Sequence, residues 1–144
     1  MRLRRNTALR VTLLVGWITG ILLPMYSLRR FSSSFRTAFD RAFQTPASHV
    51  LMHLLLYAVL AAILASFLPR AIRSGWRGNL MVMTTIAVVA GLQETIQLAS
   101  KQRAFGSAEA FDFLVDLGGA MLGLLAFSLA SRCMARRAES HLRQ

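Results

Sequence analysis

Long uncharged stretches separated by short basic segments dominate the pattern along the chain. Each stretch is close to the roughly 20 residues that a helix needs to cross about 30 Å of hydrocarbon. Backbone groups exposed to lipid must satisfy their own hydrogen bonds, so we expect helices there. The pattern predicts an all-α membrane protein, a bundle of four transmembrane helices. The four predicted spans are residues 11–28, 48–68, 79–98 and 110–131.

The ends of these stretches carry helix signals. Thr45 followed by Pro46 is typical of an N-cap and a first helical residue, and Pro69 ends the second span. Residues 74–78 predict a short turn. Residues 11–28 are longer than the apolar core of a signal peptide, and no small-residue cleavage motif follows them, so we expect an uncleaved first span.

A phenylalanine stripe marks the segment between the first two spans. Phe31, Phe35, Phe39 and Phe43 recur every four residues, which places them along one face of a helix. The charged side chains of the segment lie off that face. Two interpretations stay open: an amphipathic helix lying in the membrane interface, or a short buried connecting helix packed on the bundle.

Composition and charge agree with a membrane protein. The 144 residues fit one domain and are 55% hydrophobic but only 16% charged, where soluble domains have about 25% charged residues. All 17 lysines and arginines lie outside the four spans, eleven on the side of the N-terminus and six on the other. This bias favours two cytoplasmic termini, with residues 132–144 as a basic tail. The net charge of +11 therefore reflects topology and contact with anionic lipid, and we expect no nucleic-acid partner.

Polar side chains inside the spans form a second pattern. Because successive spans run in opposite directions, the start of the second span, the end of the third and the start of the fourth lie at one depth. Polar residues occupy these three ends at helical spacings. In the expected orientation they lie near the outer leaflet. They are His49, His53, Tyr57, Glu94, Gln97, Asp112 and Asp116, and the loop that carries Lys101 and Arg103 adjoins them.

The carboxylates in this set are expected to face the bundle interior. An unpaired carboxylate at the bilayer centre costs about 2.5–3.5 kcal/mol on insertion scales. Pairing with a histidine, Lys101 or Arg103 would offset that cost. Such contacts could serve only to fix the bundle, at about 1 kcal/mol each. Since intramembrane ionisable groups usually mark functional sites, we expect instead a site for a polar or ionic group.

Two small-residue motifs predict close helix contacts. Gly16-x-x-x-Gly20 lies in the first span and Gly119-x-x-x-Gly123 in the fourth. Such motifs let helix backbones approach closely, and we expect them to pack these two spans together. Cys133 is the single cysteine, which excludes an intramolecular disulfide.

The polar residues resemble the motifs of the VanZ-like family of small bacterial membrane proteins. The resemblance covers roughly residues 45 to 127. The chain departs from the family where His49 and Val50 replace a frequent Asp-Lys pair, and where Asp116 replaces a usual Asn. The matching motifs are Glu94-x-x-Gln97, Arg103, Asp112-x-x-x-Asp116-x-x-Gly119-x-x-x-Gly123, and His53-x-x-x-Tyr57.

The resemblance implies a location in the bacterial plasma (inner) membrane and a role in the cell envelope. Founding members of the family are linked to low-level resistance to teicoplanin, a lipoglycopeptide antibiotic, and the resemblance implies no particular reaction. The partners we expect are membrane lipids, with a lipid-linked cell-wall intermediate or a lipoglycopeptide as the bound group. The residues predicted to bind it are His53, Tyr57, Glu94, Gln97, Arg103, Asp112 and Asp116.

An intramembrane enzyme acting on an envelope lipid is the alternative. His53 would be its general base, oriented by Asp112 or Glu94, because histidine titrates near neutral pH. These three residues are the catalytic candidates. We expect a binding protein rather than an enzyme.

No metal or cofactor is expected from the sequence. His49 and His53 with a carboxylate could hold a metal ion, but the chain lacks the His-Glu-x-x-His motif. An ion path is not expected either. Residues 58–68 and 117–131, the inner halves of two spans, contain only apolar residues, glycines and serines.

Overall fold

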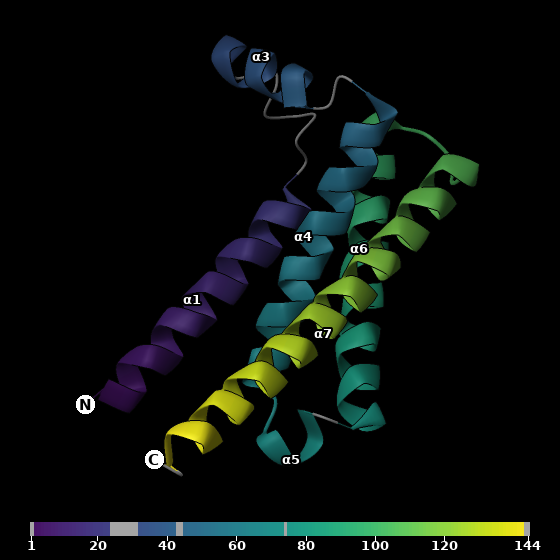
Figure 1. Cartoon of the computed structure of the whole chain (residues 1–144). Coiled ribbons are helices and arrows are strands. Elements are labelled where there is room, and N and C mark those ends of the chain that lie inside the picture. Colours follow the sequence, from purple (N-terminus) through teal and green to yellow (C-terminus); the bar gives the residue numbers. More distant parts are fainter. Residues whose placement is uncertain (1, 24–31, 43–44, 74, 143–144) are drawn as a thin grey trace.

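A computed structural model of the chain describes residues 2–23, 32–42, 45–73 and 75–142 (Figure 1). The described residues are almost entirely helical and contain no strand, as the sequence predicts. The helices are α1 (Arg2–Leu22), α3 (Ser33–Ala42), α4 (Pro46–Phe67), α5 (Arg70–Arg73), α6 (Trp76–Lys101) and α7 (Ser107–Leu142).

Three of these helices, α4, α6 and α7, are long and apolar enough to cross a membrane. The chain is therefore a multi-pass membrane protein by the length and composition of its helices. A shorter apolar stretch, Thr7–Leu22, lies in α1. The predicted first span, residues 11–28, continues past the end of α1 into residues that the structure does not describe. The fourth span thus stays a prediction.

The start of α4 follows the predicted capping pattern. The Ser48 backbone N–H donates to the Thr45 side-chain oxygen at 3.1 Å, and the Thr45 backbone N–H donates to the Ser48 hydroxyl at 3.2 Å. This reciprocal pair is a capping box, and Pro46 occupies the first turn. The helix ends at Phe67, just before the predicted stop at Pro69.

The predicted turn at residues 74–78 is wrong in its second half, because α6 begins at Trp76 with Gly75 as its N-cap. Gly78 is needed for helix packing rather than for a turn. A Cβ atom built on Gly78 would overlap the backbone carbonyl oxygen of Ile72 in α5. The glycine therefore lets the short helix α5 fold back against the first turn of α6.

The most extensive helix contact is between α4 and α7, which both start at the end of the bundle near α3 (Figure 1). Cβ atoms built on Gly119 and Gly123 would overlap the α4 backbone at Leu54 and Ala58. The second glycine motif thus packs α7 on α4, and the predicted pairing with the first span is wrong. Neither Gly16 nor Gly20 has an atom within 4 Å of such a Cβ among the described residues.

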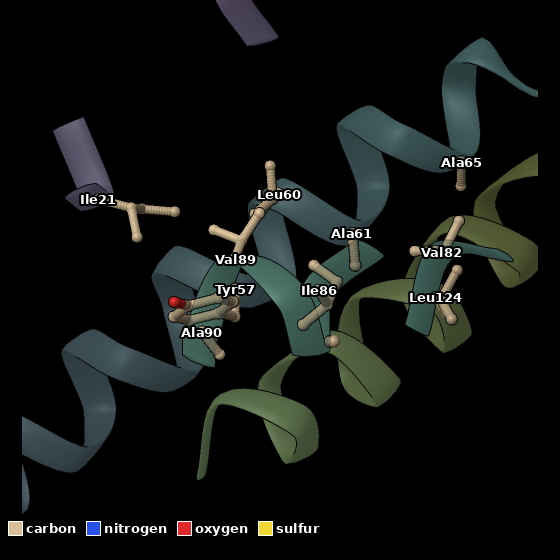
Figure 2. Close-up of a cluster of buried hydrophobic side chains, with 11 residues drawn as sticks. Ile21, Tyr57, Leu60, Ala61, Ala65, Val82, Ile86, Val89, Ala90 and Leu124 are labelled. Carbon is tan, nitrogen blue, oxygen red and sulfur yellow. The ribbon is translucent and has the colours of Figure 1, made fainter. Parts of the chain in front are cut away.

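The hydrophobic core lies where α4, α6 and α7 meet (Figure 2). Leu60 of α4 and Ile86 of α6 are fully buried there, and Leu124 of α7 is nearly so. On the described part of α1, Ile21 joins this core, and the Trp17 indole N–H donates to the Leu56 carbonyl oxygen at 3.0 Å. The core therefore holds the three long helices together, with α1 added along one side.

The segment that carries the phenylalanine stripe forms helix α3, as predicted. Among its described side chains only Phe39 is half-buried and the rest are exposed. Figure 1 places α3 beyond the end of the bundle. The described side chains do not decide between the two interpretations of the stripe, so both stay predictions. Phe31, Phe43 and the side chain of Phe35 lie outside the described residues.

The last helix is longer than the predicted fourth span. α7 runs without a break from Ser107 to Leu142 and so includes most of the predicted basic tail, residues 132–144. The start of α1 and the end of α7 lie at the end of the bundle opposite α3 (Figure 1). The predicted cytoplasmic location of the two termini stays a prediction.

Candidate functional site

Polar side chains from three helices meet at the end of the bundle nearest α3. Helices α4 and α7 run parallel from this end, and α6 terminates there. Successive polar residues on α4 and α7 are four apart, about one helical turn. They therefore line the contact between α4 and α7 in successive layers, one turn apart. We call this group the polar cluster. It consists of His49, His53, Tyr57, Gln93, Glu94, Asp112 and Asp116.

The innermost layer of the polar cluster is a pair of buried side chains, one from α4 and one from α7. His53 Nδ1 lies 2.7 Å from Asp116 Oδ1, and the two residues are 5% and 0% exposed. Asp116 Oδ2 has no hydrogen-bond partner in the described part of the chain. A fully buried carboxylate is thus held by one histidine and keeps one oxygen available.

A second histidine–aspartate pair lies one helical turn further out. His49 Nε2 is 3.3 Å from Asp112 Oδ2, and the side chains are 42% and 21% exposed. The His49 and His53 rings are also close, with their centroids 4.5 Å apart. The cluster therefore changes from closed to open along the α4–α7 contact, with His49 at its open end.

Asp116, rather than either predicted carboxylate, orients His53. The sequence alone predicts Asp112 or Glu94 in that role. Because α4 and α7 are parallel and in register, His53 faces the aspartate that lies one turn deeper than the partner of His49. The parallel packing of two helices that are distant in sequence fixes this choice.

Tyr57 contacts a residue that sequence analysis missed. Its hydroxyl donates to Gln93 Oε1 on α6 at 2.6 Å, and both side chains are buried. Gln93 had one available signal, because it is a polar residue inside an apolar span, one turn before Gln97. This hydrogen bond connects the α4–α7 pairs to α6.

Glu94 completes the polar cluster from α6. It is 4% exposed, and its Oε1 atom has no hydrogen-bond partner among the described residues. It lies within electrostatic range of His53, Asp112 and Asp116. As predicted, the three acids face the bundle interior. Asp112 and Asp116 are paired with histidines, whereas Glu94 Oε1 has no hydrogen-bond partner among the described residues.

Gln97 and Arg103 do not join the other predicted binding residues. Gln97 Oε1 accepts a hydrogen bond from Lys101 Nζ at 3.0 Å, on the more exposed last turns of α6. Arg103 is exposed in the α6–α7 connection, and no ion pair or hydrogen bond of its side chain is found within the described ranges. The expected Arg103–carboxylate pairing is therefore absent there, and both cations are exposed to the surroundings.

The polar cluster has an excess of hydrogen-bond acceptors. It contains three carboxylates against two imidazoles, one amide and one phenol, and no lysine or arginine belongs to it. Two carboxylate oxygens are buried without a partner in the described structure. A group that brings donors or positive charge, such as a hydroxyl, an ammonium or a metal cation, complements this arrangement.

Comparisons with protein-family models, with curated proteins and with solved structures give no match. The fold and the cluster define the class as a multi-pass, all-helical membrane protein whose polar groups meet between three helices.

Proposed function

We propose that this chain is a VanZ-like protein of the bacterial plasma membrane that binds a polar or lipid-linked envelope group at the polar cluster. The proposal is carried by one observation. Glu94 Oε1 and Asp116 Oδ2 are buried acceptors without a partner among the described residues, at the place where three helices meet. A buried unsatisfied polar group costs about 1–3 kcal/mol, so a ligand that donates to these oxygens would recover that cost.

The positions of the cations favour a ligand that also carries a phosphate. Lys101 and Arg103 are exposed where α6 connects to α7, at the end of the bundle that carries the cluster. Arginine binds phosphate through a bidentate pair of N–H groups. A sugar or amine donating to the carboxylates, with a phosphate near Arg103, corresponds to a lipid-linked cell-wall intermediate at the headgroup level of the membrane.

Binding is tested with the full chain in lipid nanodiscs. The probes are a polyprenyl-diphosphate-linked disaccharide and the polyprenyl diphosphate alone. We expect Glu94→Gln to weaken binding of the disaccharide lipid at least tenfold, by about 1.4 kcal/mol, and to leave the diphosphate probe unaffected. Arg103→Ala should weaken both probes. Arg137→Ala, an exposed arginine near the opposite end of α7, is the matched control. Equal binding by all variants contradicts the proposal.

An envelope role also predicts a cellular phenotype. Expression in a teicoplanin-susceptible bacterium should raise the inhibitory concentration of the antibiotic. Arg103→Ala, at the same level of membrane protein, should abolish the increase, because it removes the phosphate contact. An unchanged phenotype in the Arg103 variant removes the central contact from the proposal.

The side of the membrane is tested on α7 itself. Ser107 begins the helix near the cluster, and the exposed Cys133 lies toward its other end. In intact cells a membrane-impermeant thiol reagent should label Ser107→Cys in a Cys133→Ser background and should not label native Cys133. The reverse labelling would place the cluster at the cytoplasmic leaflet.

An intramembrane enzyme is the second candidate, favoured by the His53–Asp116 pair. A histidine whose Nδ1 is held 2.7 Å from a buried carboxylate has the geometry of an oriented general base. In this alternative His53 activates a water molecule. Mass spectrometry of the disaccharide lipid after incubation should then reveal a hydrolysed product that His53→Gln abolishes. An unchanged lipid leaves binding as the function.

A further inference from the structure

We propose that His49, His53 and Asp112 bind a divalent transition-metal ion, with Zn²⁺ as the ion that best fits the ligands. The sequence alone predicts no metal site, because its two histidines lack a defined third ligand. The fold supplies that ligand from α7. Each of the three side chains offers one donor atom, and these atoms all lie within 4.8 Å of one another.

The outer pair already has the separation of two ligands on one ion. His49 Nε2 and Asp112 Oδ2 are 3.3 Å apart. In a tetrahedral site with zinc–ligand bonds of about 2.0–2.1 Å, two ligand atoms lie about 3.3 Å from each other. An ion placed between these atoms therefore replaces a hydrogen bond without separating α4 from α7. The donor atom of His53 lies within 4.8 Å of both of these atoms.

His53 is held in the way that metal-binding histidines are held. Its Nδ1 is bonded to the fully buried Asp116, which leaves Nε2 as the nitrogen for the ion. Within the described residues, His53 Nε2 has no hydrogen-bond partner, and the atom is not fully buried. A histidine that binds a metal through one ring nitrogen usually donates the N–H of its other ring nitrogen to a carboxylate or carbonyl, which fixes the tautomer and the ring orientation.

The ligand set selects the class of ion. Two imidazoles and one carboxylate suit Zn²⁺ and similar transition metals, whereas Mg²⁺ and Ca²⁺ take oxygen ligands. A dication also offsets the charge of the three carboxylates in the polar cluster. Three protein ligands leave one tetrahedral position open, which is the arrangement of zinc sites that also bind a water molecule or a substrate.

The metal site does not depend on the proposed lipid binding, since metal content is measured without any lipid probe. A protein that binds zinc but no lipid, or lipid but no zinc, separates the two proposals. His49 is the most informative ligand to remove. Its side chain is 42% exposed at the edge of the cluster, so His49→Gln leaves the buried His53–Asp116 pair in place.

The experiment uses the full chain, purified in detergent without a polyhistidine tag. The protein is treated with a chelator, dialysed against ZnCl₂ and then freed of excess zinc, and the metal content is measured by mass spectrometry. We expect about one zinc per chain, as three protein ligands imply. His49→Gln and Asp112→Asn should each lower this value at least tenfold. His141→Gln, which removes the only other histidine, should retain the full content.

Asp116→Asn distinguishes an oriented metal ligand from a purely structural pair. It retains all three ligands and the size of the side chain, so it should lower zinc affinity about 10–100-fold, measured with a competing chelator dye. Circular dichroism and size-exclusion chromatography confirm that each variant is folded. Wild-type protein with less than about a tenth of an equivalent of zinc overturns the proposal, and so does equal zinc loss in the His141 control.

Discussion

The two halves of the α4–α7 contact are built from different chemistry. Near α3, the helices are joined by two histidine–aspartate pairs, at 2.7 Å and 3.3 Å. One or two turns further along the same helices, Gly119 and Gly123 bring α7 directly against the backbone of α4. One half has polar side chains between the helices, whereas the other has almost no side-chain atoms between them.

This difference indicates that the packing of α4 on α7 and the candidate site depend on different residues. Close glycine packing accounts for the distance between the helices without any polar group. Replacing a buried ion pair by apolar residues of similar volume is often neutral or stabilising, so the polar half is weak evidence for stability. We infer that the glycine half fixes the helix contact, which leaves the polar half available for the proposed ligand.

Breaking the inner polar pair on one side gives the largest expected effect. His53→Ala leaves Asp116 as a buried carboxylate without its partner and should destabilise the protein by about 3 kcal/mol. The midpoint of thermal unfolding in detergent measures it. His53→Leu combined with Asp116→Leu should recover most of that loss, because the Asp116 carboxylate is then no longer buried without its partner. A double variant as unstable as His53→Ala would show that the pair itself holds the helices together.

Filling the glycine half gives the next largest effect. Gly123→Ala places a methyl group against the backbone of Ala58, so α7 must move away and the free energy of unfolding should fall by about 1–3 kcal/mol. Gly16→Ala is the matched control, since no described atom lies within 4 Å of its Cβ position. Thermal unfolding of both variants in one detergent makes the comparison. Equal behaviour of the two variants would contradict the role of the glycine half.

Removing the hydrogen bond between Tyr57 of α4 and Gln93 of α6 gives a smaller effect. Tyr57→Phe leaves the ring in the core but deprives Gln93 Oε1 of its donor, which should cost about 1 kcal/mol. The same unfolding assay measures this change. Leu60→Met provides a control for a volume-conserving change in the same core, and its cost should be below about 1.5 kcal/mol.

The smallest expected effect lies on α1. Trp17→Phe removes the indole N–H that donates to the Leu56 carbonyl oxygen, at a cost of about 0.5–1 kcal/mol. The α4–α7 contact should be unaffected, so protease cleavage should increase within α1 and stay constant in α7. Equal loss of protection in both helices would mean that α1 is part of the same cooperative unit.

Local pattern predicted much of the fold. The apolar stretches and the cap at Thr45 identified α4, α6 and α7, because helix length and capping depend on neighbouring residues. The pairing of helices was harder to predict. The partner of the Gly119–Gly123 motif was assigned to the wrong helix, since a small-residue stripe indicates a close contact but not which helix provides the other side.

The candidate site was predicted as a set of residues rather than as a set of contacts. The depth of each residue follows from helix direction, so the sequence could bring His53, Glu94 and Asp116 to one end of the bundle. Which atoms meet depends on helix rotation and register, and that is why Asp116, not Asp112, faces His53. Gln93 was missed for the same reason, because its rotation toward Tyr57 is set by packing.

The backbone contact at Gly119 lies next to the inner end of the polar cluster. Asp116 lies about 4.5 Å along α7 from this contact and Asp112 about 10.5 Å, at 1.5 Å per residue. The inner pair is accordingly shorter and closed, and the outer pair is longer and open. In the proposed function, a ligand therefore reaches the exposed His49 first and the closed His53–Asp116 pair last.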